Sequence, residues 1–226
     1  MKVYILFLIG FAFLDARTVS LPKNSPISVL SSIKTVDIEH PNEIATFDPR
    51  WVDSLSLSLP CYGVPVPKRT MRLPNAPRNY RNGTHKGLDF FANWGTPVRS
   101  VADGIVVRSD LHYEEVPADF RENLLKATTK VGHTPSDIFN SVLLGKSVFL
   151  DHGFDLVPGF RTISIYAHLS HIEKEIVPGA VVKRGELLGK SGNTGMREST
   201  IGSKAGSHLH WEMILQKGEQ EIYLGK

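Results

Sequence analysis

Short apolar runs separated by glycine or proline dominate the chain from about residue 84 to its end. They are rich in valine, isoleucine, phenylalanine, leucine and threonine, as β-strands are. The runs are GLDFFA, TPVRSVA, GIVVRSD, SVFLDHG, TISIYAHL, AVVKRG, LLGKSG and HLHWEMIL. This pattern predicts a mainly β fold, a small antiparallel sheet or barrel-like sandwich. A weak internal echo between GTPVRSVADG and GAVVKRGELLG is typical of a duplicated β motif.

One stretch, near residues 114–145, has helical rather than alternating periodicity. PADFRENLLKATTK places Phe120, Leu124 and Leu125 on one side of a helix. TPSDIFNSVLL then begins with Pro135 and Ser136, which suit a helix start. We therefore predict a helical insert that lies as a flap on the β core.

The N-terminal part has neither periodicity. Lys2 precedes an apolar run at residues 3–14, which is too short to cross a bilayer and typical of a signal peptide, the alternative being a buried helix or strand. Scattered prolines then break up regular elements. We predict a signal peptide at 1–20, an irregular arm at 21–72 and one domain at 73–226. The mature protein is then exported, periplasmic or extracellular, without a transmembrane segment.

Composition excludes several classes of function. The net charge of the 226 residues is only +3, and no basic block suggests nucleic-acid binding. Cys61 is the only cysteine in the sequence, which excludes an internal disulfide and a thiolate zinc site.

Two His-x-x-x-Asp pairs occur in the sequence. In HKGLD, His85 and Asp89 would lie about 13 Å apart in a straight strand, so they can share an ion only if the chain bends at Gly87. In HTPSD, Asp137 belongs to the predicted helix start, where it complements the helix dipole, so we interpret His133 and Asp137 as structural.

The segment SHLHWE contains the only His-x-His of the chain. Alternate residues of a strand share a face, so His208 and His210 can approach a common centre. Two histidines and an aspartate leave one zinc position free for water, as in catalytic rather than structural sites. Remaining histidines, such as His168 in YAHLS, can then transfer protons. A hydrogen-bonded core or rim histidine is the alternative for His168.

In this setting the chain resembles the lysostaphin-type zinc metallopeptidases, peptidoglycan endopeptidases built on a duplicated hybrid motif. The matching segments are YRNGTHKGLDF, WGTPVRSVADGIVV, DHGF, TISIYAHLS, VPGAVVKRGELLGKSGNTG and SHLHWEM. The N-terminal 70 residues and the helical insert lie outside the resemblance.

The resemblance implies a role for each matching residue. His85, Asp89 and His210 would be the ligands of one zinc ion per chain. His168 and His208 would be catalytic, and one or both would activate water or stabilise the tetrahedral intermediate. The implied substrate is peptidoglycan, cleaved in its cross-bridge or stem peptide, and we expect a monomer.

Three further residues are candidates for supporting this site. Glu212 follows His210 by two positions, so it can hydrogen-bond a ligand histidine. His152 in LDHGF is most simply a strand-end histidine that can also support the site. Tyr80, with its neighbours Arg78 and Arg81, precedes the first ligand and can contact substrate.

Other functions remain possible from the sequence. The first is a catalytically inactive relative that activates a cell-wall amidase, although such relatives typically lose ligands. The second is a lipoyl- or biotinyl-like carrier, suggested by GAVVKRGELLG but without a suitable lysine. The third is a peptidase with a nonbacterial protein substrate.

Overall fold

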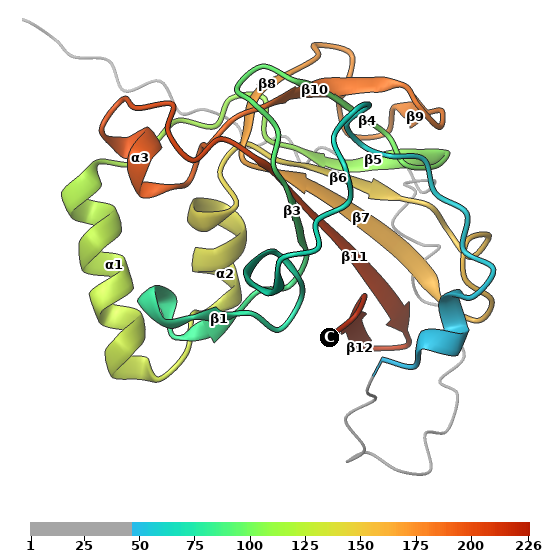
Figure 1. The fold of residues 1–226 in the computed structure, drawn as a ribbon, viewed down its shortest axis with the longest axis horizontal. Coiled ribbons are helices and arrows are strands. Elements are labelled where there is room, and N and C mark those ends of the chain that lie inside the picture. The colour runs from blue at the N-terminus through green and yellow to red at the C-terminus, as the bar shows by residue number, and fades with distance from the viewer. Residues whose placement is uncertain (1–46) are drawn as a thin grey trace, which may run out of the picture. The chain divides into compact units, whose positions relative to one another are not determined.

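The structure, a computed structural model, describes residues 47–226 (Figure 1). The predicted signal peptide lies outside these residues. The strands are β1 (Pro77–Arg78), β2 (Gly83–Thr84), β3 (Leu88–Phe90), β4 (Pro97–Arg99), β5 (Gly104–Ser109), β6 (Val148–Asp151), β7 (Arg161–Ala167), β8 (Leu169–Ile172), β9 (Val181–Val182), β10 (Leu187–Ser191), β11 (Leu209–Lys217) and β12 (Gln220–Tyr223).

These strands form three antiparallel sheets. The largest has the order β12-β11-β7-β6-β5-β9, with β3 also paired to β11. A second sheet has the order β4-β10-β8, and β1 pairs with β2. The prediction of a mainly β, antiparallel fold is confirmed. The largest sheet stays open, because β12 and β9 end it without pairing to each other.

The central strands β7 and β11 are covered on both faces, which explains why their sequences are almost continuously apolar. One face contributes Tyr166 and Met213 to the main core, together with Val98 and Leu188 of the second sheet. The opposite face carries Ile165, Ala167 and Ile214, and the helical insert packs on it through a smaller cluster of Phe139, Leu143 and Leu144.

The predicted helical insert is confirmed. It consists of α1 (Ala118–Val131), α2 (Ser136–Ile138) and a π-helical turn at Phe139–Leu143, and α1 and α2 lie on the same side of the sheets as the short α3 (Arg197–Thr200) (Figure 1). The inner side of α1 differs from the expectation. Phe120 is 51 % exposed, whereas the polar residues Arg121 and Thr128 are buried. The reason is that this helix borders a polar pocket as well as a core.

Residues 47–72 contain two 3-10 turns, Pro49–Val52 and Thr70–Arg72, and no strand. They nevertheless pack on the main core, where Cys61 is fully buried and Trp51 lies against Phe160. Burial raises the pKa of the Cys61 thiol to about 12, so it is unreactive at neutral pH. No helix within residues 47–226 is both long and apolar enough to cross a membrane.

Candidate active site

The pairing of β3 with β11 places Asp89 directly opposite His210. His85 lies in the segment between β2 and β3, and its side chain turns back toward the same point. Asp89 Oδ1 lies 2.9 Å from His85 Nε2 and 2.8 Å from His210 Nδ1, and the two nitrogens are 3.0 Å apart. Three side chains expected to share an ion therefore converge on one point.

Gly87 allows this convergence, although not through an unusual backbone angle, since its φ is not positive. A Cβ at this position would lie 2.2 Å from the Trp211 carbonyl oxygen and 2.8 Å from Cγ of Glu212. The glycine is required because the segment after His85 passes directly against β11.

The outer nitrogen of each candidate ligand histidine is held by an acceptor. His85 Nδ1 donates to the Leu73 carbonyl oxygen over 2.8 Å, and His210 Nε2 donates to Glu212 Oε1 over 2.6 Å. Because carbonyls and carboxylates accept, these contacts place hydrogens on the outer nitrogens and turn His85 Nε2 and His210 Nδ1 inward. Glu212 is fully buried on the same face of β11 as His210.

Asp89 is held on both sides. Its second oxygen, Oδ2, accepts a hydrogen bond from Arg78 Nη2 over 3.0 Å, which leaves Oδ1 directed at the two histidines. Burial raises the pKa of Asp89, but its contacts with His210 and His85 outweigh burial and lower the pKa far below its usual range. The carboxylate is therefore ionised at neutral pH.

The two remaining histidines form a second pair beside this cluster. His168 lies between β7 and β8, and His208 immediately precedes β11. Their ring centroids are 4.8 Å apart, the His168 ring is 5.6 Å from that of His210, and His208 Nε2 is 3.5 Å from Asp89 Oδ1. All five histidine and aspartate side chains predicted from the sequence are thus gathered in one place.

Backbone carbonyls fix this second pair in one tautomer. His168 Nδ1 donates to Thr194 O over 2.8 Å, and His208 Nδ1 donates to Gly206 O over 2.7 Å. His168 also has a positive φ of 59°, which is uncommon outside glycine and redirects its side chain from the strand. Each ring therefore keeps an unprotonated Nε2 for the site.

Electrostatics keep the second pair neutral. Burial lowers the pKa of His168 well below 6.5, and the neighbouring His208 and His210 lower it further. Burial also lowers the pKa of His208, against the attraction of Asp89. At His210, burial lowers the pKa but the hydrogen bonds to Asp89 and Glu212 raise it to about 9. At neutral pH His168 and His208 are thus proton acceptors beside the ionised Asp89.

All five residues line one pocket with a volume of about 720 Å³. Its walls come from the segment around Tyr80, from α1, from the π-helical turn and from the loop around α3. The helical insert and the 196–206 loop, which lie outside the core β motif, therefore shape the space in front of the histidines.

The spacing of the three donor atoms is close to that of ligands around a zinc ion. Four ligands at about 2.0–2.1 Å in a tetrahedron stand about 3.3 Å apart. The three inward atoms of His85, Asp89 and His210 are 2.8–3.0 Å apart, so a shift of a few tenths of an ångström would suit them to that ion. One carboxylate oxygen and two imidazole nitrogens, each with its outer atom hydrogen-bonded, are a typical zinc donor set. Within residues 47–226 this is the one cluster of its kind.

The other candidates lie in different settings. Tyr80 lines the pocket and is 58 % exposed. His152 does not line it: Nδ1 donates to Asp103 O over 2.6 Å, and Nε2 lies 2.7 Å from Ser164 Oγ. Asp137 lies in the first turn of α2, apart from the metal-binding cluster.

Sequence reasoning missed the residues that anchor the site from a distance. Thr194 and Leu73 act through backbone carbonyls, for which the sequence offers no signal. The sequence analysis assigned Arg121 to no site. The one signal for its place at the pocket is that a positively charged residue occurs within the predicted helical insert.

Part of the chain matches a known protein family. Residues 127–222 match the family model of Peptidase family M23, a span that contains His168, His208 and His210 but begins after His85 and Asp89. Over these residues, which are less than half of the chain, the protein is similar to Peptidase family M23.

Individual relatives match over part of their length. An uncharacterized metalloprotease of Haemophilus influenzae is 31% identical over 128 residues, 57% of this chain and 18% of that protein. Peptidoglycan DD-endopeptidase ShyA of Vibrio cholerae is 29% identical over 140 residues, 62% of this chain and 22% of that protein. The chain thus spans about a fifth of the length of these relatives.

Solved structures are also similar. The crystal structure of a putative peptidase M23 from Pseudomonas aeruginosa has 25% sequence identity and a TM-score of 0.42, covering 80% of this chain and 52% of that one. The catalytic domain of lysostaphin from Staphylococcus simulans has 21% identity and a TM-score of 0.38, covering 74% and 86%.

Proposed function

We propose that this M23 domain is an active zinc-dependent endopeptidase that hydrolyses peptide bonds in bacterial peptidoglycan. The observation that supports it best is the meeting of two complete sets of side chains in one open pocket. His85, Asp89 and His210 offer three converging donor atoms, and His168 and His208 offer two neutral rings beside them. A protein that had lost catalysis would not need both sets.

The donor residues would hold the ion with their inward atoms, His85 Nε2, Asp89 Oδ1 and His210 Nδ1. A zinc ion bound there would act as a Lewis acid that polarises the scissile carbonyl and makes water acidic. Glu212 and Arg78 would keep His210 and Asp89 oriented during the reaction.

The second pair of histidines would move the protons. An unprotonated Nε2 on His168 or His208 can accept a proton from the attacking water. The resulting imidazolium can then stabilise the oxyanion or protonate the departing amine. Because both rings are held by Nδ1 and have similar access, the geometry leaves the two roles interchangeable between them.

The proposal also includes the substrate and the location of the protein. The peptidoglycan DD-endopeptidase from Vibrio cholerae motivates the substrate class. We further propose that residues 1–20 act as a signal peptide for export, that 21–72 form an arm, and that 73–226 form the catalytic domain as a monomer.

Digestion of purified peptidoglycan tests the proposal. Zinc-loaded wild-type protein should release peptide fragments identifiable by mass spectrometry. His210→Ala should lose both zinc and activity, whereas His168→Ala and His208→Ala should keep stoichiometric zinc and lose about 10²–10⁴-fold in rate. Intact peptidoglycan despite bound zinc would reject the proposal and favour the amidase activator, which is then tested by adding a cell-wall amidase.

A further inference from the structure

The pocket in front of the histidines holds a buried arginine that the proposed chemistry does not use. Arg121 projects from α1, is only 9 % exposed and lines the pocket. Its Nε donates to the Gly195 carbonyl oxygen over 3.0 Å. Within residues 47–226 no carboxylate forms an ion pair with it, although Glu115 and Glu198 attract it from a distance, and Nε makes its one hydrogen bond to the protein.

This arginine lies close to the catalytic histidines. Thr194 O accepts from His168 Nδ1, and the next carbonyl along the chain, Gly195 O, accepts from Arg121 Nε. Consecutive residues of one turn thus hold a proposed proton-transfer ring and the guanidinium. Both side chains line the same pocket.

The other arginines of the pocket are engaged differently. Arg78 forms an ion pair with Asp89. Arg81 is buried, donates to Thr84 O and lies over the Phe139 ring, so it adds positive charge but is committed to packing. Arg197 is exposed at the mouth. Arg121 alone combines burial with a guanidinium edge that is free for a ligand.

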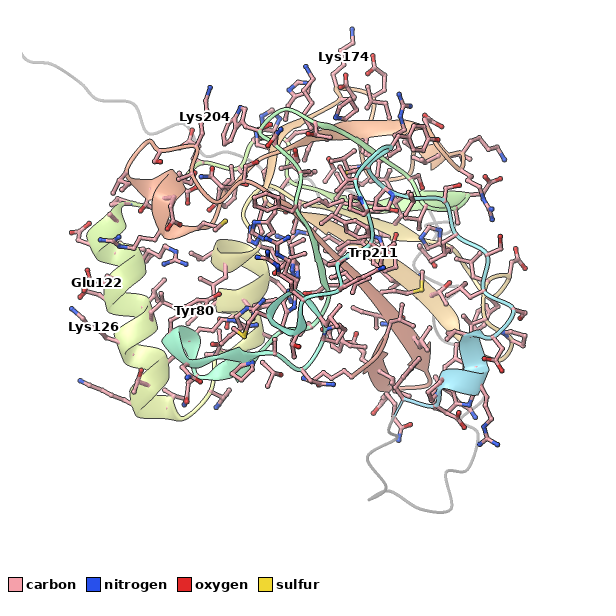
Figure 2. All side chains as sticks on the ribbon, in the orientation of Figure 1. Tyr80, Glu122, Lys126, Lys174, Lys204 and Trp211 are labelled. Carbon is pink, nitrogen blue, oxygen red and sulfur yellow. The ribbon has the colours of Figure 1, made fainter. Side chains whose placement is uncertain are left out.

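Acidic residues of the pocket do not neutralise this edge. Glu122 forms an ion pair with Lys126 over 3.0 Å. Figure 2 shows both side chains on the outer side of α1, whereas Tyr80 lies on the inner side of this helix. Asp119 is exposed, and Glu198, which is half-buried, forms no ion pair with Arg121. These three carboxylates thus line the pocket without contacting the guanidinium.

We propose that Arg121 binds a carboxylate of the substrate peptide and so selects peptides that carry one. The two Nη groups can donate in parallel to both oxygens, the arrangement in which arginine recognises carboxylates. Because no carboxylate contacts the largely buried guanidinium, a substrate carboxylate there would form its first direct ion pair. This inference rests on the proposed function for the class of substrate, since peptidoglycan stem peptides carry carboxylates. In some stem peptides a carboxylate is replaced by an amide.

Binding measurements test it without turnover. The zinc-loaded His208→Ala protein would be titrated by calorimetry with the stem tetrapeptide L-Ala–γ-D-Glu–meso-diaminopimelate–D-Ala and with its three singly amidated forms. Amidation of one carboxylate should weaken binding about 10- to 100-fold, as expected for a charge-assisted contact in a buried place. In Arg121→Gln, added to the same protein, the four peptides should bind within twofold of each other.

Matched variants separate recognition from folding. Arg121→Lys retains the charge and should retain part of the preference, which also covers the case in which Arg121→Gln does not fold. Arg197→Gln removes a pocket charge without removing the buried guanidinium, and it should keep the full preference.

The outcomes distinguish the inference from the proposed function. The inference is overturned if the His208→Ala protein, which retains Arg121, binds all four peptides equally or binds none of them. It is also overturned if the preference survives when Arg121→Gln is added. Cleavage of peptidoglycan by wild type without a carboxylate preference rejects the inference alone. A preference that depends on Arg121 in a protein that cleaves nothing supports the inference and rejects the proposed catalysis alone.

Discussion

His210 and Glu212 share one face of β11, and His210 Nε2 lies 2.6 Å from the fully buried Glu212 Oε1. The contact fixes the ring so that Nδ1 faces Asp89 across the strand pair. A buried carboxylate without further hydrogen bonds at Oε2 is costly, and its place behind a candidate ligand is the arrangement that strengthens metal binding.

Glu212→Leu is therefore expected to weaken zinc binding about 10- to 100-fold, because His210 loses the acceptor that orients it and raises its basicity. Competition with a chromophoric chelator measures the affinity. Glu221→Leu on β12 is the matched control, since its carboxylate is exposed and accepts a hydrogen bond from Gln216. Unchanged affinity in Glu212→Leu would show that the ring is held by other means.

The strands could be predicted well from the sequence. All eight apolar runs contain a strand, because glycine and proline mark their ends and β-branched residues fill them. Three strands were missed: β1 and β2 have only two residues each, too few to show periodicity, and the four-residue β12 contains only one buried residue. The inner side of α1 was misjudged because Arg121 faces a pocket rather than a core, and an apolar pattern cannot report that.

The candidate site was predictable where side chains alone define it. The alternation of His208 and His210 and the turn at Gly87 follow from local geometry, and the structure brings these residues together. The support from Arg78 and from the Thr194 carbonyl was not predictable, since it depends on segments that meet only in the folded chain.

Gly87→Ala should destabilise the protein by about 2–3 kcal/mol, because its Cβ would meet the Trp211 backbone and force β3 away from β11. Zinc affinity should fall with it, since Asp89 and His210 are cross-strand partners. Urea unfolding and chelator competition measure the two effects. Gly63→Ala is the comparison: its φ is +77° but its surroundings are open, so it should cost only about 1–2 kcal/mol and leave zinc binding unchanged. Equal effects of the two variants on zinc would contradict this account.

The two His-x-x-x-Asp pairs should behave differently. His85→Ala removes one of three converging donor atoms and should reduce zinc affinity by at least about 100-fold, beyond the effect of losing a supporting contact. His133→Ala should leave affinity and activity within twofold, because His133 precedes α2 and belongs to no metal-binding cluster of the described residues. Zinc content by atomic absorption after dialysis distinguishes them, and zinc loss in His133→Ala would contradict the assignment.

His152 gives the fold a dependence on pH that is separate from the metal site. Burial lowers the pKa of His152 below 6.5, against the hydrogen bond to Asp103 O and the attraction of Asp151 and Asp103. When pH falls below 6.5, the unfolded chain takes up a proton that the folded chain excludes, so stability is lost between 6.5 and the lower folded pKa. From pH 7.5 to 5.5 this group should therefore reduce the free energy of unfolding. His152→Gln should make that loss smaller, measured by urea unfolding of both proteins with zinc removed. An identical pH dependence in the two proteins would show that His152 is protonated equally in the folded and unfolded states.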